Sequence, residues 1–263
     1  MRLSPFALLD HWRAGTPRPD KVGWLGSVAY AHRGLHLPGV PENSLSAFRG
    51  AIARGMGIEC DVQRSADGQA MVFHDSELDR LTAETGPLGA RRAEELGRIE
   101  LAGSQDRIPT LRQMLDEVAG RVPILIEIKS GGASFKHAGA LCQAVRRVLE
   151  GYTGTHAIMS FDPRVVRWFA NRSPHTVRGL VVTEENAKAL PGQIRRRLAL
   201  WLARPDFLAY DIRDLPSRFA AGQRKRGLPV LTWTVRSAEH RERALDHADE
   251  FGAGRQVPFH RLC

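Results

Sequence analysis

Cysteine, lysine and long apolar runs are scarce in this chain of 263 residues. Cys60, Cys142 and Cys263 are far apart and odd in number, which argues against a disulfide framework or a zinc cluster. No apolar run reaches the roughly 18 residues that span a bilayer, and the apolar stretch at 5–9 is too short for a signal peptide. We therefore expect a cytoplasmic protein, in a reducing compartment, without a transmembrane segment.

Arginine supplies most of a formal net charge of +9. It is scattered along the chain, and the dense clusters at 195–197 and 224–226 fall within helical patterns, which favours solvated helix faces. No nucleic-acid partner is therefore expected, whereas peripheral contact with a membrane stays open and the oligomeric state is left undetermined. Because lysine is rare, Lys129 at the end of an apolar run is conspicuous.

Short apolar runs alternate with helical patterns, the order expected of a parallel sheet with crossover helices. The predicted strands are 28–32, 58–63, 124–128, 157–161, 177–182, 207–212 and 230–235, and the predicted helices are 44–54, 111–119, 135–149, 164–171, 185–203, 217–226 and 238–248. Seven such strands, in a chain near the roughly 250 residues typical of the fold, predict an α/β TIM (β/α)8 barrel. Two glycines and a proline after Ala248 leave the eighth strand poorly defined.

One further strand breaks the alternation. The run 70–73 follows 58–63 too closely for a parallel crossover, so it must return antiparallel. A two-residue turn at Asp67-Gly68 would place His74 directly opposite Asp61. At the start of the helix 44–54, Asn43 is the predicted N-cap.

Acidic residues gather at the ends of two predicted strands. Period-two alternation sends Glu59 and Asp61 to one face of their strand, and Glu127 ends the strand 124–128. Three oxygen ligands without a soft one favour Mg²⁺ or Ca²⁺ over zinc. The alternative interpretation is a set of salt bridges with Arg33 and Lys129.

Basic side chains lie beside these carboxylates. His32 and His74 stand at strand ends, where a pair of histidines can both take and give a proton, although a single histidine there is more often structural. The guanidinium of Arg33 can bind a phosphate through two hydrogen bonds, and Lys129 supplies a point charge on the same face as Glu127. A buried Glu127–Lys129 ion pair is the alternative.

Ordered motifs then point to a family. They are AHRG at 31–34, PEN at 41–43, IECDVQ at 58–63, VFHD at 72–75, LDRLT at 78–82, IPTL at 108–111, IEIK at 126–129, SFD at 160–162 and WTV at 233–235. Through these motifs the chain resembles the glycerophosphodiester phosphodiesterase family over about 31–236. Arg236 departs from the family pattern, which usually has Asn there, and the tail after Asp249 lacks the usual apolar run, so we expect it to reduce stability.

The resemblance implies a phosphoric diester hydrolase on a barrel similar to that of phosphatidylinositol phospholipases C. The implied reaction is metal-dependent hydrolysis of small glycerophosphodiesters to glycerol 3-phosphate and an alcohol. The family pattern assigns roles by position: His32 and His74 to acid-base catalysis, Glu59, Asp61 and Glu127 to a divalent metal, Arg33 and Lys129 to the phosphate, Trp233 to the pocket lining, and Glu42 and Asn43 to a motif that orders the site.

The resemblance also implies a single catalytic barrel domain over 1–263, with an N-terminal extension at 1–27 and an insertion over the active site at 75–106. Two questions stay open: which histidine is the acid, and whether the nucleophile is the substrate's own hydroxyl or a water. A lysophospholipase D-like or phospholipase C-like lipid phosphodiesterase on the same barrel is the alternative function. An inactive regulatory barrel would usually have lost a histidine or a carboxylate, and none is missing.

Overall fold

Eight parallel strands form a ring in the computed structural model, which describes residues 5–131, 135–185 and 187–253. They are β1 (Tyr30–His32), β2 (Gly57–Arg64), β4 (Ile124–Ile128), β5 (His156–Ser160), β6 (Val177–Val182), β7 (Phe207–Asp211), β8 (Val230–Val235) and β9 (Glu250–Ala253). Each pairs with the next, and β1 pairs with both β2 and β9. The predicted TIM barrel is confirmed.

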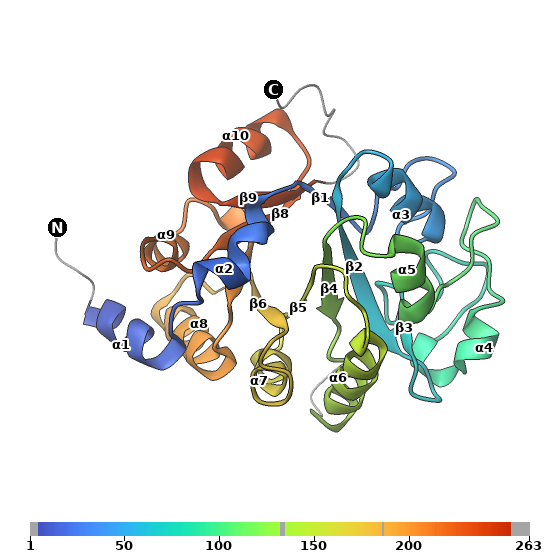
Figure 1. The fold of residues 1–263 in the computed structure, drawn as a ribbon, viewed down its shortest axis with the longest axis horizontal. Helices are drawn as coiled ribbons and strands as arrows, with labels where there is room; N and C mark the ends of the chain where they lie inside the picture. Colours follow the sequence, from blue (N-terminus) through green and yellow to red (C-terminus); the bar gives the residue numbers. More distant parts are fainter. Residues whose placement is uncertain (1–4, 132–134, 186, 254–263) are drawn as a thin grey trace.

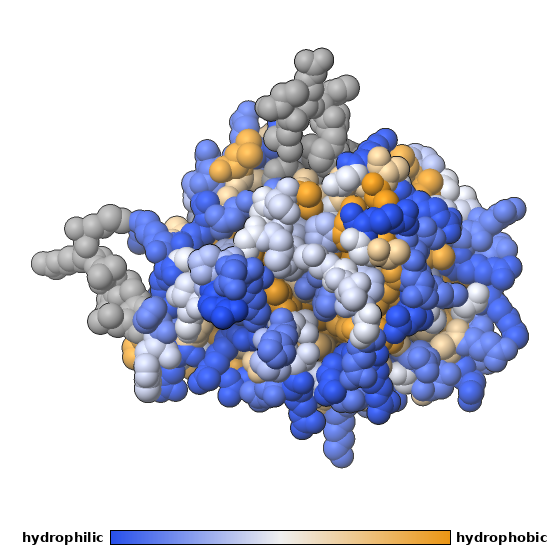
Figure 2. All heavy atoms as spheres, viewed as in Figure 1, coloured by the Kyte–Doolittle hydropathy of each residue, from blue (hydrophilic) through white to orange (hydrophobic). Residues whose placement is uncertain are grey.

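Helices alternate with these strands and lie outside the ring (Figure 1). They are α3 (Leu45–Ile52), α5 (Leu111–Val118), α6 (Phe135–Leu149), α7 (Pro163–Arg172), α8 (Leu190–Ala203), α9 (Arg218–Lys225) and α10 (Ala238–His247). The face seen in Figure 2 is mostly hydrophilic, with apolar surface in small separate patches. Within the described ranges, no helix is long and apolar enough to cross a membrane.

The eighth strand is short and irregular. β9 has four residues and aligns with β1 only at Tyr30–Gly252 and Ala31–Ala253. Its register against β8 shifts between Thr232 and Val235. The ring therefore has a weak seam at β9, as its glycine content indicated, and the rest of the unusual tail, 254–263, lies outside the described residues.

Local sequence explains where two predicted helix starts were wrong. The N-cap of α3 is Ser44, whose hydroxyl accepts a hydrogen bond from the Ala47 amide, whereas Asn43 adopts a left-handed conformation with φ of 57°. Helix α8 begins at Leu190 rather than at 185, because Pro191 lacks an amide donor and fits only the first turn of a helix.

The antiparallel return is confirmed, but its predicted turn was wrong. Strand β3 (Ala70–Val72) pairs with β2 through a three-residue connection in which Gly68 has φ of 86°. The Ser65 amide donates to the Gln69 carbonyl at 3.0 Å, and the Phe73 amide donates to the Asp61 carbonyl at 3.0 Å. Phe73, and not His74, is therefore the residue opposite Asp61, because a three-residue loop shifts the register by one.

Two peripheral segments pack on the barrel. The first contains α1 (Pro5–Ala14), α2 (Pro19–Val22) and the 3-10 helix η1 (Gly23–Gly26), and its Val22 and Leu25 join the cluster inside the ring. The second, 75–106, contains η2 (Leu88–Ala90) and α4 (Ala93–Leu96). It builds a separate apolar cluster with the hairpin, formed by Met71, Phe73, Leu78, Leu88, Leu96, Leu101 and Ile108.

Close packing inside the ring gives a test of the fold. A Cβ added at Gly179 on β6 would lie 2.3 Å from the ring of Phe207, which is fully buried on β7. We expect Gly179→Ala to lower the free energy of unfolding by about 1–3 kcal/mol, because an overpacked core must shift. Urea unfolding followed by circular dichroism measures the change.

Gly222, within α9, is the matched control. A Cβ there would meet no atom within 4 Å, so Gly222→Ala should raise the free energy of unfolding by about 1 kcal/mol through helix propensity. Equal stability of the two alanine variants would contradict this account of the ring.

Candidate active site

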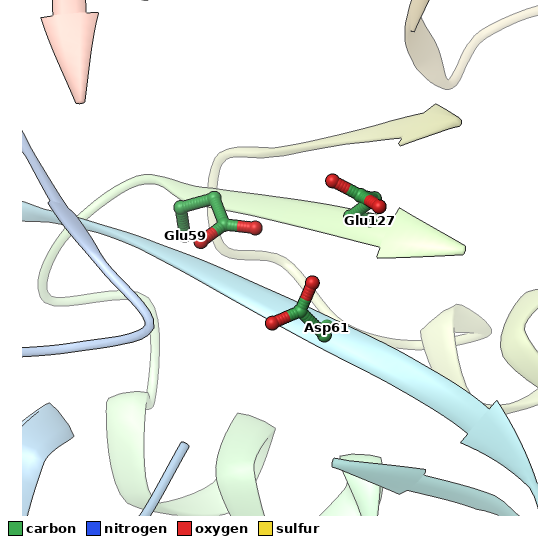
Figure 3. A group of neighbouring side chains, drawn as sticks. All are labelled: Glu59, Asp61 and Glu127. Carbon is green, nitrogen blue, oxygen red and sulfur yellow. The ribbon is translucent and has the colours of Figure 1, made fainter. Parts of the chain in front are cut away.

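Three carboxylates from two neighbouring strands converge inside the ring. Glu59 and Asp61 lie two residues apart on β2, and Glu127 on β4 is the register partner of Asp61. Figure 3 shows their side chains pointing into a shared space, and one oxygen from each lies within 4.8 Å of the others. All three are buried. The alternation expected from the sequence is therefore present in the structure.

Burial raises the pKa of all three acids, but their net shifts differ. It raises the pKa of Glu59 well above the usual range, and the charges of Asp61 and Glu127 raise it further. Burial also raises the pKa of Glu127. For Asp61 the nearby charges of Lys129 and Arg33 outweigh burial and lower the pKa to about 2. Ionisation of all three carboxyl groups at once is therefore disfavoured with Lys129 and Arg33 as their neighbouring cations.

This donor set fits a divalent cation. It consists of carboxylate oxygens alone, which hard ions such as Mg²⁺ and Ca²⁺ prefer. Burial, and then the charges of Asp61 and Glu127, raise the pKa of Glu59, and a bound cation would oppose both effects. The salt bridges considered as the alternative are present as well, and they involve the same carboxylates that could hold a cation.

Lys129 and Arg33 supply those ion pairs. Lys129 Nζ lies 2.8 Å from Asp61 Oδ1 and also pairs with Glu127. Arg33 Nε lies 3.3 Å from Asp61 Oδ2, and the Arg33 amide donates to Glu59 Oε2 at 3.0 Å. Burial lowers the pKa of Lys129, but the carboxylates of Asp61 and Glu127 outweigh this effect and raise it to about 12. Both cations are therefore charged and fixed beside the acidic cluster.

Two residues at this site have a left-handed backbone conformation. Arg33 has φ of 58° and is followed by Gly34, where a Cβ would lie 2.9 Å from side-chain atoms of Ala47 and Phe48. Asn43, with φ of 57°, donates from Nδ2 to Asp61 Oδ2 at 2.9 Å. Its Oδ1 accepts from the Asp61 amide at 3.3 Å. The side chain of Asn43 thus orients Asp61 instead of capping α3.

The two histidines reach the same pocket from different directions. His32 ends β1, with Nε2 4.0 Å from Glu59 Oε2, and burial together with the Arg33 charge lowers its pKa to about 3. His74 follows β3, and burial lowers its pKa as well. Its Nδ1 lies 2.6 Å from Asp75 Oδ1. That contact assigns the Nδ1 proton to the Asp75 bond and leaves the Nε2 lone pair available.

Asp75 belongs to a chain of contacts that the sequence analysis missed. Arg80 donates from Nε to Asp75 Oδ2 at 2.5 Å and from Nη2 to Glu42 Oε1 at 2.7 Å. Glu42 also accepts from Arg33 Nη1 at 2.8 Å. The segment 75–106 is thereby tied to both His74 and Arg33. The VFHD and LDRLT motifs contained the signal, since an acid next to a histidine can fix its tautomer.

One pocket of about 220 Å³ contains all eight predicted site residues. They are His32, Arg33, Glu59, Asp61, His74, Glu127, Lys129 and Trp233. Part of its wall is apolar, because the Trp233 and Phe161 rings meet edge to face with centroids 5.7 Å apart. Trp233 Nε1 donates to the Ala209 carbonyl at 3.1 Å, which fixes the indole. Phe161 was named in a motif but not as a pocket residue.

Comparison with known proteins now identifies the family. The model of the glycerophosphoryl diester phosphodiesterase family matches residues 32–250. The chain belongs to this family. The family is one of phosphoric diester hydrolases, and the match covers every predicted site residue.

Relatives support the assignment. A glycerophosphodiester phosphodiesterase of Caldanaerobacter subterraneus is 28% identical over 229 residues, covering 83% of this chain and 90% of that protein. A putative glycerophosphodiester phosphodiesterase of Bacillus subtilis is 28% identical over 213 residues, covering 78% and 84%.

Solved structures share the fold. A phosphodiesterase of Oleispira antarctica, in complex with the product sn-glycerol-3-phosphate, gives a TM-score of 0.74 at 21% identity, covering 87% of this chain and 92% of that one. The glycerophosphodiester phosphodiesterase of Thermotoga maritima gives 0.67 at 25% identity, covering 86% and 93%.

Arg80 provides a test of the contact chain. Arg80→Ala removes the ion pairs with Asp75 and Glu42. We expect the kcat for phosphodiester hydrolysis to fall about 10- to 100-fold, the usual effect of removing a group that orients a functional side chain. The melting temperature should barely change, because the Arg80 side chain is about half exposed.

Arg98→Ala is the control on the same segment, since Arg98 pairs only at the surface with Glu94. An Arg80→Ala variant with wild-type kcat would show that the contact chain has no part in the reaction.

Proposed function

We propose that this protein hydrolyses glycerophosphodiesters to glycerol 3-phosphate and an alcohol in a metal-dependent reaction. The observation that carries the proposal is the convergence of two histidines, three carboxylates, an arginine and a lysine in one pocket. In this proposal the cationic groups bind the phosphodiester, and the histidines transfer protons to and from the reacting oxygens. The names of the relatives and the product bound to the Oleispira protein point to the same substrate class.

Glu59, Asp61 and Glu127 would hold the metal, Mg²⁺ or Ca²⁺. When bound, such an ion supplies positive charge against the phosphate oxygens and lowers the cost of charge developing there. The chain's own contribution is to place three acids in one buried position and to keep Asp61 among them ionised. Lys129 and Asn43 achieve this for Asp61 through contacts at 2.8 Å and 2.9 Å.

Arg33 and Lys129 bind the phosphate in this proposal. The Arg33 guanidinium can offer two parallel N–H donors to phosphate oxygens, and its position is fixed by Glu42 and by its own left-handed backbone. The Lys129 ammonium stabilises negative charge on the non-bridging oxygens of the phosphate. Both are preorganised by their ion pairs, so little reorganisation accompanies binding.

His32 and His74 act as the acid-base pair. Burial lowers the pKa of both rings and so favours, in the free protein, the neutral form that can accept a proton at a ring nitrogen. Asp75 holds His74 through Nδ1 and stabilises its protonated form. One histidine enters the reaction neutral and takes the proton of the nucleophile. The other enters it protonated, a form that the negative charge of the bound phosphate favours, and gives that proton to the departing alcohol oxygen.

Two nucleophiles fit this arrangement, the hydroxyl of the substrate's glycerol and a water molecule. The first gives a cyclic glycerol phosphate before hydrolysis, and the second gives glycerol 3-phosphate directly. Phosphorus NMR during turnover distinguishes the two, because the cyclic phosphate has its own resonance.

A lipid phosphodiesterase, lysophospholipase D-like or phospholipase C-like, is the second candidate. The apolar wall favours it, since Phe161 is 46% exposed beside Trp233 at the pocket. An acyl chain would cover such a surface. Comparing glycerophosphocholine with lysophosphatidylcholine as substrates decides between a small and a lipid substrate.

The domain assignment is part of the proposal. Residues 1–263 form a single catalytic barrel domain, 1–27 is an N-terminal extension and 75–106 is an insertion over the active site. The apolar cluster of the second segment and the Arg80 contacts support this arrangement. A cytoplasmic location is supported by Cys60 and Cys142, which are buried free thiols.

Metal dependence is tested with a chelator. Treatment with EDTA should abolish glycerol 3-phosphate release from glycerophosphocholine, and Mg²⁺ or Ca²⁺ should restore it. Glu59→Gln should lower kcat/KM by at least about 100-fold, because one ligand charge is lost. The exposed Glu100→Gln is the matched control. Full activity in the chelator would exclude the metal from the reaction.

The histidine pair is tested by substitution. His32→Ala and His74→Ala should each lower kcat by about 100- to 10,000-fold, the usual contribution of a general acid or base. Melting temperatures show whether each variant remains folded. His175→Ala, at an exposed position, is the control. Retention of wild-type kcat in either pocket variant would remove that histidine from the mechanism.

A further inference from the structure

Helix α8 exposes a row of large apolar side chains. Leu190, Ile194, Leu198 and Leu202 are spaced four residues apart, which places them along one side of the helix. Each is between 46% and 67% exposed. The opposite side of the helix faces the barrel, where Leu200 is fully buried. The row is about 18 Å long, at 1.5 Å per residue.

Most of the exposed large hydrophobic side chains of the described residues lie on this side of the barrel. Among the described residues, six of the nine exposed large hydrophobic side chains belong to α8 or to α1, which packs beside it. The α1 members are Leu9 and Trp12, and Trp12 is 74% exposed. Trp201 Nε1 donates to Asp10 Oδ1 at 2.8 Å and joins the two helices. Such a concentration marks an interaction surface.

Basic residues border the row. At 100° per residue, Arg195 falls on one side of the row and is exposed. Arg197 falls on the other side, where its half-buried guanidinium lies 5.6 Å from the centre of the Phe219 ring. Arg196 turns inward, with Nη2 3.2 Å from Glu184 Oε2. The Arg13 guanidinium lies 4.8 Å from the centre of the Trp12 ring. The sequence of α8 contains no acidic residue, and Asp10, the one acid of α1, is buried.

We propose that this α8–α1 face docks on an anionic membrane surface, with α8 lying in the lipid interface. A row of leucine-type side chains bordered by arginines, with a tryptophan nearby, has the chemistry of helices that lie in the plane of a membrane. The arginines pair with anionic headgroups while the apolar row enters the acyl boundary.

Charge decides against a second copy of the chain on this face. Two α8 helices in contact would bring arginines against arginines, because neither helix carries an acid to pair with them. A lipid surface offers both an apolar layer and negative charge.

One end of helix α8 lies at the same end of the barrel as the pocket. Helix α8 follows β6, so it begins at the carboxyl ends of the strands, where His32 and Lys129 lie. The N-terminal end of the row therefore lies at the same end of the barrel as the pocket. The docking does not depend on the proposed reaction, because it is measured by binding alone.

The test is co-sedimentation of the full chain with vesicles. We expect binding to equimolar phosphatidylglycerol and phosphatidylcholine, little binding to phosphatidylcholine alone, and weaker binding at high salt. Leu198→Asp should lower the partition coefficient by about tenfold or more, and Arg195→Ala by about five-fold. Circular dichroism and hydrolysis of a soluble diester confirm that these variants are folded.

Leu245→Asp on α10 is the matched control, an exposed leucine outside this face, and it should bind as the wild type does. Wild-type binding by Leu198→Asp, or equal binding to both vesicle types, would overturn the proposal. A dimer that Leu198→Asp dissociates, without vesicle binding, would assign the face to a second copy. Saturable binding of polyglutamate without vesicle binding would assign it to an acidic protein.

Discussion

The site depends on how the chain keeps Asp61 ionised in a buried position. Its carboxylate lies within hydrogen-bonding reach of Lys129 and Asn43 and next to the Arg33 guanidinium. Without these groups, burial beside Glu59 and Glu127 would favour protonation. The surrounding loops are shaped by this requirement, since they deliver Arg33 and Asn43 from left-handed backbone positions. Such positions are costly for residues other than glycine and are kept where function requires them.

The same carboxylates serve two partners, the fixed cations of the chain and the metal we propose. A buried charge without a partner costs several kcal/mol, so the ion pairs with Lys129 and Arg33 make the acidic cluster tolerable in the free protein. These cations are also the groups positioned to meet a phosphate. Neutralisation of the site and recognition of the substrate are therefore carried out by the same side chains.

The sequence was informative where one physical rule dominated. Alternation along a strand placed Glu59 and Asp61 on one face, and Glu127 stands at the end of the neighbouring strand. The order of strand and helix patterns led to the barrel, and the motifs led to the family. It failed where two local solutions compete. Asn43 and Ser44 are both good helix caps, and only the need to hold Asp61 decides between them. The hairpin register depended on one loop residue. The Arg80 contacts join positions that no periodicity relates.

The segment 75–106 packs on the β2–β3 hairpin in an apolar cluster that is separate from the core clusters of the barrel. The segment 75–106 and the barrel can therefore accumulate substitutions at different rates. Substitutions that reshape the outer face of this segment leave the packing between strands and helices of the ring intact. Arg80 is the constraint on such change, since it couples the segment to the histidine and arginine of the pocket. Within that constraint, sequence change in the segment is separated from the packing that stabilises the ring.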